Sequence, residues 1–180
     1  MENKINERDL RHFQLLRDNV ASFLFNCASK YDMGGVLLDI APQDHAGARA
    51  CFKKNKIETL DIDPKSKATY IADICSVNED LVLRESFDVV VCTEVLEHTS
   101  NPFAAVNEIR RILKNNGIAL FSAPFDFRIH GPLPDCWRIS EYGWKALLGK
   151  GWEILEIKAL ESDRFLMPIH YTVVARKIND

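Results

Sequence analysis

Apolar residues recur along the chain at two spacings, and segments with the two spacings alternate. Short apolar runs typical of buried strands lie at Val36–Ile40, Ile57–Ile62, Thr69–Ala72, Phe87–Cys92 and Ile118–Phe121. Apolar residues three or four positions apart, which indicate amphipathic helices, lie within residues 6–30, 101–115 and 140–148. Two closing strands are expected at Trp152–Leu160 and Ile169–Ala175, joined by a loop too short for a helical crossover. The pattern predicts an α/β fold with a doubly wound, mostly parallel seven-stranded sheet and a C-terminal antiparallel strand pair.

The length of the chain bounds its organisation. A chain of 180 residues can bury one complete core and is short for two. We therefore expect a single domain over residues 1–180. Residues 1–30 are expected to form an N-terminal helical segment that packs on the sheet edge or over the ligand cleft.

The net charge bears on nucleic-acid binding, and the cysteine content bears on the cellular compartment. A formal net charge of −3 offers no basic surface for nucleic acid. The five cysteines are odd in number and show no Cys-x-x-Cys spacing, which is typical of a reducing cytoplasm. Neither a signal core nor an apolar run near the roughly 20 residues that span a bilayer is present, so we expect a cytoplasmic protein without a membrane partner. The oligomeric state is left open.

Polar residues gather where the Phe87–Cys92 run ends. Thr93, Glu94, Glu97 and His98 follow it directly. In an open α/β sheet, ligands bind beyond the carboxyl ends of the strands, so these side chains are expected in the cleft. One helical turn would aim the two carboxylates and the imidazole at a common point. Such groups suit Mg²⁺ or Mn²⁺ through oxygen and Zn²⁺ through nitrogen.

The segment from Phe125 to Arg138 is expected to form a wall of the substrate site. His130 could serve as a general base for a hydroxyl, because its reference pKa is about 6.5. Arg138 could bind a carboxylate or phosphate of the substrate. The alternative is that Asp135 and Arg138 pair with each other while Trp137 fills the core. His170, on the last expected strand, could face the cleft, although a buried structural histidine is the simpler interpretation.

From about Val36 to the C-terminus, the chain resembles the class I S-adenosylmethionine-dependent methyltransferases. The strongest segment runs from Phe87-Asp-Val-Val90 through Glu94-Val-Leu-Glu-His98 to Leu113-Lys-Asn-Asn-Gly117. The resemblance implies a Rossmann-like methyltransferase fold and S-adenosylmethionine as cofactor. Leu60–Pro64, Ala72–Ile74 and Ile129–Arg138 further resemble a small methyltransferase branch found with glycan and surface-polysaccharide genes.

The resemblance assigns cofactor roles to residues that follow the first three expected strands and to Thr93 at the exit of the fourth. Asp39 would support the loop facing the methionine part, Asp61 would accept both ribose hydroxyls, and Asp73 would accept from the adenine amine. The implied cofactor-binding set is Asp39, Ala41, Gln43, Asp61, Ile62, Asp73, Ile74 and Thr93. As alternatives, Asp39 could cap the following loop, and Asp61 and Asp63 could be turn residues before Pro64.

Two features depart from that family's pattern. Ala41-Pro42-Gln43 stands where a glycine-rich turn lets the backbone approach the cofactor. Ala41 is small enough for close approach, and the Gln43 amide could replace lost backbone contacts. The link from Pro64 to Ala68 leaves no room for a crossover helix between the second and third strands.

The Glu94-x-x-Glu97-His98 cluster also looks like that of metal-assisted O-methyltransferases in ubiquinone biosynthesis and of small-RNA 2′-O-methyltransferases. In those proteins a further histidine follows the fifth strand, and His130 lies in the matching region. The resemblance implies a divalent metal, Mg²⁺, Mn²⁺ or Zn²⁺, held by Glu94, Glu97, His98 and His130. The alternative is that Glu97 and His98 only order the loop before the helix cap at Asn101.

Together these observations predict an S-adenosylmethionine-dependent enzyme that methylates an oxygen of a sugar, glycan or small polar metabolite. Its catalytic residues would be His130, Glu94 and Arg138. One alternative is a binding or regulatory module that kept the fold and lost turnover, motivated by the altered turn after Asp39. The third is an NAD-dependent dehydrogenase, which the missing G-x-G-x-x-G weakens.

Overall fold

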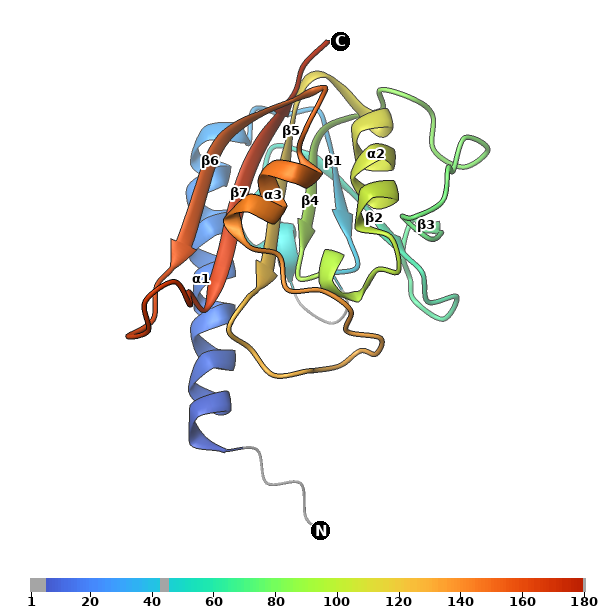
Figure 1. Cartoon of the computed structure of the whole chain (residues 1–180). Coiled ribbons are helices and arrows are strands. Elements are labelled where there is room, and N and C mark those ends of the chain that lie inside the picture. Colours follow the sequence, from blue (N-terminus) through green and yellow to red (C-terminus); the bar gives the residue numbers. More distant parts are fainter. Residues whose placement is uncertain (1–5, 43–45, 180) are drawn as a thin grey trace.

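The computed structural model describes residues 6–42 and 46–179 and shows one seven-stranded sheet (Figure 1). The strands are β1 (Val36–Ile40), β2 (Lys56–Asp61), β3 (Tyr70–Ile71), β4 (Phe87–Thr93), β5 (Leu113–Pro124), β6 (Trp152–Leu160) and β7 (His170–Lys177). They lie in the order β3-β2-β1-β4-β5-β7-β6, and β7 is antiparallel to both of its neighbours. The predicted fold class, including the antiparallel closing pair, is confirmed.

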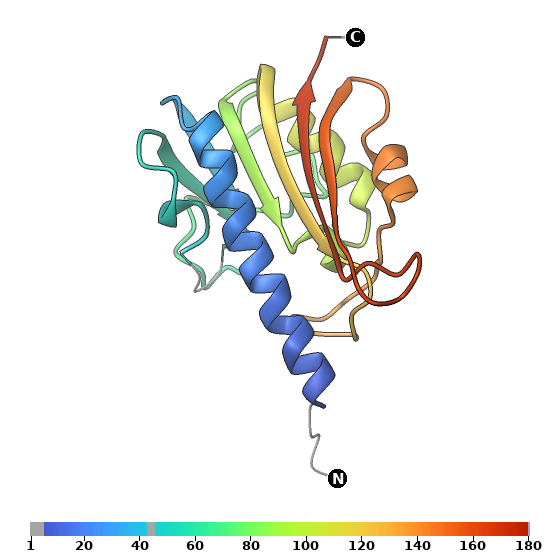
Figure 2. The same ribbon diagram turned by 90° about the vertical axis from the view of Figure 1, so that its left-hand side faces the viewer.

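Helices cover both faces of this sheet (Figure 2). The long helix α1 (Glu7–Tyr31) packs on one face, where Phe23, Leu24 and Cys27 join buried side chains of β1, β4 and β5. Helices α2 (Pro102–Ile112) and α3 (Glu141–Leu147) cover the other face. The expected N-terminal helix therefore packs on a face of the sheet and not on its edge, and its first turns extend past the carboxyl ends of the strands. The assignment of residues 1–180 to one domain stays a prediction.

Local sequence explains where the helices begin. Each of the three starts after a side-chain cap, because Asn6, Asn101 and Ser140 accept a backbone N–H three residues ahead. Pro102 occupies the first turn of α2, where its missing N–H has no cost. Within the described residues, none of the helices combines the length and apolar character that crossing a membrane requires.

Strand β5 begins five residues earlier than the apolar run predicts. Leu113 is buried and pairs with Phe87, while Asn116 adopts a left-handed φ of 63° before Gly117. The irregular pairing breaks the alternation of polar and apolar residues, so the pattern hides the first half of the strand. The end of α2 therefore runs directly into β5.

The sheet edge formed by β2 and β3 has no helical cover, as the short Pro64–Ala68 link predicts. Residues 62–69 and 72–86 connect β2, β3 and β4 through turns, without a helix. Ile62 is 66% exposed as a result. The surface beside the end of β2 is therefore accessible to solvent at Ile62.

One buried carboxylate fastens the end of α1 to the start of β2. Asp32 accepts backbone N–H groups from Lys53, Lys54 and Asn55 at 2.7–3.1 Å. Burial would raise the pKa of Asp32, but these hydrogen bonds outweigh it and hold the pKa below its ordinary value. The anion therefore stabilises the folded chain.

We expect Asp32→Ala to lower the free energy of unfolding at pH 7 by about 1.5–3 kcal/mol, the range for hydrogen bonds to a charged group. Because the folded-state pKa is depressed, this contribution is present above the unfolded pKa and is lost as the pH falls through the folded pKa. Urea unfolding should therefore show the difference from wild type narrowing below about pH 4. Lys54→Ala keeps the backbone donor and should change stability by less than about 0.5 kcal/mol. Equal effects of the two substitutions would contradict the assignment.

Candidate functional site

The loop of residues 125–138 lies beyond the carboxyl ends of the parallel strands β4 and β5 (Figure 1). Strand β4 ends at Thr93, and Glu94 then adopts a left-handed φ of 55°. This conformation costs a non-glycine residue about 1 kcal/mol or more. It turns the chain sharply into the 3₁₀ turn η2 (Leu96–His98), which places Glu97 and His98 at the strand end.

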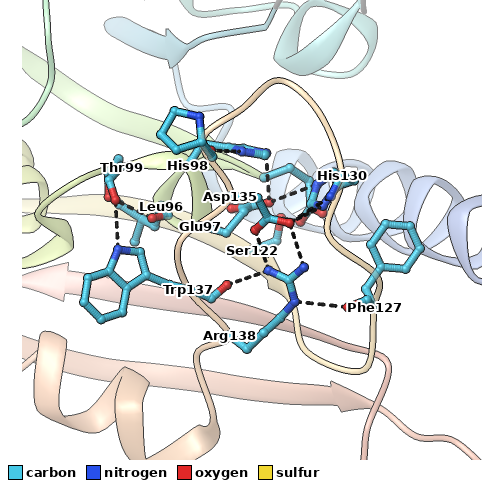
Figure 3. Close-up of polar contacts among 12 residues, drawn as sticks. Leu96, Glu97, His98, Thr99, Ser122, Phe127, His130, Asp135, Trp137 and Arg138 are labelled. Carbon is cyan, nitrogen blue, oxygen red and sulfur yellow. Dashed lines mark hydrogen bonds and ion pairs between the residues drawn. The ribbon is translucent and has the colours of Figure 1, made fainter.

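Glu97, His98 and His130 form one compact cluster, hereafter the Glu97–His98–His130 cluster (Figure 3). The Nε2 atoms of His98 and His130 lie 3.8 and 3.9 Å from Oε1 of Glu97. One ligand atom from each residue lies within 4.8 Å of the other two. The cluster joins η2 to the loop that follows β5, as the sequence predicts for three of the four expected metal ligands.

Hydrogen bonds donated by Nδ1 orient both imidazoles. Nδ1 of His98 lies 2.9 Å from the carbonyl oxygen of Pro134, and Nδ1 of His130 lies 3.0 Å from Oδ2 of Asp135. Both partners are acceptors, so each Nδ1 carries a proton and donates it. In the neutral rings the lone pair is then on Nε2, which faces Glu97. Metal-binding histidines are typically held by such outer hydrogen bonds.

The protonation of His130 fits this geometry. Burial lowers its pKa below the ordinary value, the nearby charges of His98 and Arg138 act in the same direction, and Asp135 opposes them. The neutral ring is the form that offers a nitrogen lone pair. His130 is therefore suited to bind a cation or to accept a proton.

Glu97 is the residue that lacks a partner. Its side chain is 0% exposed, and within the described part of the chain neither carboxylate oxygen has a hydrogen-bond partner. Burial raises its pKa well above the ordinary value, and the charge of Glu94 adds to the increase. A buried carboxylate without a partner is costly. This carboxylate and the two Nε2 lone pairs are ligand types that a divalent cation can take.

Glu94 has different partners from those we expected. Its Oε1 accepts from Oγ of Ser122 at 2.7 Å and contacts Nε2 of His170 at 2.6 Å. Burial would raise its pKa, but His170 and Ser122 outweigh that effect and lower the pKa. Glu94 thus does not join the Glu97–His98–His130 cluster. His170 is buried, as the sequence indicates, but nothing in the sequence identifies its partner 76 residues away.

Arg138 does not have a free donor for a substrate. A guanidinium carries five N–H groups. Here they donate to both carboxylate oxygens of Asp135 and to the carbonyl oxygens of Phe127, Arg128 and Trp137 (Figure 3). The alternative pairing with Asp135 therefore forms, and substrate binding by Arg138 stays a prediction that would require some of these hydrogen bonds to break.

Trp137 does not fill the core as that alternative proposed. Its side chain lies at the surface, and its Nε1 donates to the carbonyl oxygen of Thr99 at 2.8 Å. The contact ties the loop to the segment that precedes α2. Arg138 and Trp137 therefore both serve to hold the loop over the cleft.

The turn after β1 is tight although it lacks the glycines that are usual at this position. Asp39 is buried and accepts the N–H of Ala48 at 2.8 Å, and burial raises its pKa to about 6. A Cβ at Gly47 would clash with Oδ2 of Asp39. Ala41 takes a left-handed φ of 48°, a conformation that glycine usually supplies. Asp39 thus orients the following loop, and Ala41 provides the tight turn. Gln43 lies outside the described residues.

Two carboxylates lie on the β2–β3 side of the cleft. Asp61 is mostly buried at the end of β2, and its Oδ1 accepts the N–H of Asp63 at 2.9 Å. The turn role and the ribose role are compatible, because Oδ2 remains for a ligand. Asp73 follows β3, and its Oδ1 accepts the N–H of Cys75 at 2.8 Å. Both carboxylates can accept hydrogen bonds from hydroxyl or amine groups.

The apolar residues of the implied cofactor set differ in their exposure. Ile74 belongs to the hydrophobic core and is only 5% exposed, so little of its side chain remains to cover an adenine ring. Ile62 is exposed beside Asp61. Thr93 is half-buried at the end of β4 and pairs in register with Ser122 of β5. Of the three, Ile62 and Thr93 remain accessible to a ligand.

We expect Glu97→Gln to preserve or raise the melting temperature in the presence of chelator, because the amide can donate to an imidazole lone pair where the carboxylate cannot. Zn²⁺ at 100 times its Kd should stabilise the wild type by about 2.7 kcal/mol and the variant hardly at all. The matched control is Glu108→Gln, which alters a buried carboxylate hydrogen-bonded to Arg111 and Asn78 and should destabilise the chain with or without metal. If Glu97→Gln destabilised the chelated protein as strongly as this control, Glu97 would be a structural residue.

Comparison with known proteins agrees with this fold. A family model described as a methyltransferase domain matches residues 26–121, more than half of the chain. The ubiquinone biosynthesis O-methyltransferase of Actinobacillus pleuropneumoniae serotype 7 (strain AP76) is 29% identical over 99 residues, which are 49% of this chain and 41% of that protein. The protein of the same name from Histophilus somni (strain 2336) is 45% identical over 38 residues, or 21% of this chain and 16% of that protein. The matches span less than half the length of these curated relatives.

Solved structures share the fold at low sequence identity. An S-adenosylmethionine-dependent methyltransferase from Mesorhizobium loti has a TM-score of 0.65 at 14% identity, with 87% of this chain and 96% of that chain covered. The MccD protein has a TM-score of 0.64 at 16% identity, with 89% and 98% covered. These likenesses concern the fold alone, whereas the family model concerns sequence. The chain belongs to the methyltransferase domain family, a family of class I S-adenosylmethionine-dependent methyltransferases.

Proposed function

We propose that the chain is an S-adenosylmethionine-dependent enzyme that transfers a methyl group to an oxygen of a sugar, glycan or other small polar metabolite. The observation that carries the proposal is the Glu97–His98–His130 cluster, which gathers a buried carboxylate and two imidazoles at the carboxyl end of β4. Family membership supports the cofactor, and two relatives named as O-methyltransferases support oxygen as the acceptor atom. Support for the glycan class comes only from the sequence resemblance.

The residues on the β1 and β2 side would bind the cofactor. Asp61 can accept ribose hydroxyls through Oδ2, while the turn at Ala41 brings the backbone close without a bulky side chain. S-adenosylmethionine, when bound, supplies an electrophilic methyl group on a sulfonium. The methyl transfer is an in-line displacement, so the main task of the protein is to position the acceptor and favour its deprotonation.

We further propose that the Glu97–His98–His130 cluster holds a divalent cation. Two imidazole nitrogens and one carboxylate favour Zn²⁺ or Mn²⁺ over Mg²⁺, which prefers oxygen ligands. A bound ion would lower the pKa of an acceptor hydroxyl. Glu97 would balance the charge of the ion, and His98 and His130 would present Nε2. If no ion is held, His130 becomes the candidate general base.

The alternatives differ in their support. The silent binding module is favoured by Ala41-Pro42 in place of a glycine turn, and by the strain of a left-handed alanine. The dehydrogenase alternative loses support, because β7 lies antiparallel between β5 and β6, whereas the corresponding sheets of nicotinamide-binding proteins are parallel.

Mass spectrometry can test the proposal. The protein is incubated with S-adenosylmethionine, with Mn²⁺ or Zn²⁺, and with one of three acceptors: catechol, methyl α-glucoside or UDP-glucose. Cofactor binding without product from any acceptor would favour the silent module.

We expect Asp61→Ala to weaken S-adenosylhomocysteine binding by about 1.5–3 kcal/mol in calorimetric titration, because it removes charge-assisted hydrogen bonds to the ribose. Asp63→Ala is the matched control, since Asp63 is an exposed neighbour in the same turn and should leave the affinity near wild type. Equal affinity of wild type and a folded Asp61→Ala variant would remove Asp61 from the cofactor site.

We expect chelator to abolish methyl transfer and added Mn²⁺ or Zn²⁺ to restore it, while S-adenosylhomocysteine affinity stays unchanged. If His130 acts as the base without a metal, chelator should have no effect, and His130→Ala should lower the rate on the order of 10²–10⁴-fold. Initial rates with and without chelator, measured for both proteins, separate the two mechanisms. Indifference of the rate to both treatments would show that the catalytic centre lies elsewhere.

A further inference from the structure

Three side chains from distant parts of the sequence form a hydrogen-bonded chain that ends at Glu94. Nδ2 of Asn19, on α1, lies 2.7 Å from Nδ1 of His170, at the start of β7. Nε2 of His170 lies 2.6 Å from Oε1 of Glu94, which follows β4. We call this chain the Asn19–His170–Glu94 relay. It connects the middle of α1 to the mouth of the cleft.

The hydrogen bonds fix the direction of donation in the relay. The Asn19 amide donates to Nδ1 of His170, so the ring proton is on Nε2 and is donated to Glu94. Oγ of Ser122 donates to the same carboxylate oxygen at 2.7 Å. Both donors therefore act on Oε1. In the described part of the chain, Oε2 accepts no hydrogen bond and is left for an external donor.

Burial divides the relay into a rigid support and an accessible end. The side chains of His170 and Ser122 are 0% exposed, whereas the Glu94 side chain is 29% exposed. The backbone N–H of Glu94 donates to the carbonyl oxygen of Ser122 at 3.1 Å, which holds the left-handed turn in place. A tie between α1 and the sheet would need neither a charged group nor backbone strain at its exposed end. This arrangement is typical of a positioned functional group.

Glu94 also lies close to the Glu97–His98–His130 cluster. Glu94 precedes Glu97 by three residues, at the turn that leads from β4 into η2. An acceptor hydroxyl beside that cluster would therefore lie near the Glu94 carboxylate, which His170 and Ser122 hold in place through Oε1. A carboxylate oxygen accepts a hydroxyl hydrogen bond and thereby fixes the direction of the hydroxyl lone pairs.

We propose that Asn19 and His170 are positioning residues that hold Glu94 with Oε2 directed at the acceptor hydroxyl. The inference rests on the proposed function, because it concerns the acceptor of that reaction. Both positions lie outside the segment matched by the family model, which covers residues 26–121. Helix α1 is accordingly part of the catalytic apparatus as well as a cover for the sheet.

The first experiment observes the relay without turnover. In the full chain labelled with ¹⁵N-histidine, His170 should appear by NMR as the Nε2–H tautomer with a downfield proton. Glu94→Gln and Asn19→Ala should each shift its ring nitrogens, whereas Gln14→Ala, an exposed amide change on the same helix, should not. If Glu94→Gln left the His170 nitrogens unmoved, the relay and the proposal would be overturned.

The second experiment tests positioning against a purely structural role, with catechol and methyl α-glucoside as acceptors. His170→Phe should lower kcat about 10- to 100-fold, the scale of a misplaced reacting group, with the KM for S-adenosylmethionine unchanged. His170→Gln keeps an N–H donor near the position of Nε2 and should restore most of kcat. Thr172→Val, at another buried site of β7, is the control and should affect stability alone.

The outcomes distinguish the two hypotheses. Equal kcat losses in His170→Phe and His170→Gln, or losses that follow thermal stability across all variants, would overturn the positioning role and leave the proposed function intact. An absence of methyl transfer to either acceptor by the wild type would remove the proposed function and the positioning role with it. In that case the NMR experiment would still show whether the relay exists.

Discussion

The arrangement of the candidate site depends on a buried carboxyl group, that of Glu97, which has no hydrogen-bond partner among the described residues. Glu97 cannot move its carboxylate to solvent easily, because its backbone carbonyl accepts N–H groups from Cys136 and Trp137 at 2.6 and 3.2 Å. The loop and η2 are thereby held together around that carboxylate. Burying this group without a hydrogen-bond partner costs stability, and the lone pairs of two imidazoles face the same space, which supports the cation site proposed above.

The loop over the cleft is organised to keep those imidazoles in place. The five N–H groups of Arg138 donate to acceptors within the loop, among them both carboxylate oxygens of Asp135. Asp135 in turn accepts from the backbone N–H and from Nδ1 of His130. Pro134 fixes His98 through its carbonyl oxygen. Arg138, which the sequence suggested as a substrate-binding group, therefore acts within the loop, where it holds the partner of His130. This division, in which Asp135 and Pro134 orient the two imidazoles, supports the metal site proposed above.

The sequence predicts the sheet well and the site only in part. The spacing of apolar residues is a local property of each segment, so it could locate all seven strands and the antiparallel closing pair. The first half of β5 could not be located, because its pairing with β4 is irregular near Asn116. Glu97, His98 and His130 could be grouped because η2 and the loop after β5 lie at the same sheet edge. The partners of Arg138 and Glu94 could not be predicted, since they depend on loop conformation and on contacts such as Asn19 with His170, 151 residues apart.

Glu94 and Glu97, three residues apart, have opposite environments. His170 and Ser122 lower the pKa of Glu94, whereas burial and the charge of Glu94 raise the pKa of Glu97. Two neighbouring carboxylates whose pKa values are driven apart are typical of a site that gives them separate tasks. The chain turns sharply at Glu94, which has a left-handed φ. The Glu94 side chain contacts His170 of β7, whereas the Glu97 side chain lies near His130 of the loop. Since Asn19 of α1 supports the partner of Glu94, the packing of this helix on the sheet determines the electrostatics of the cleft as well as the stability of the core.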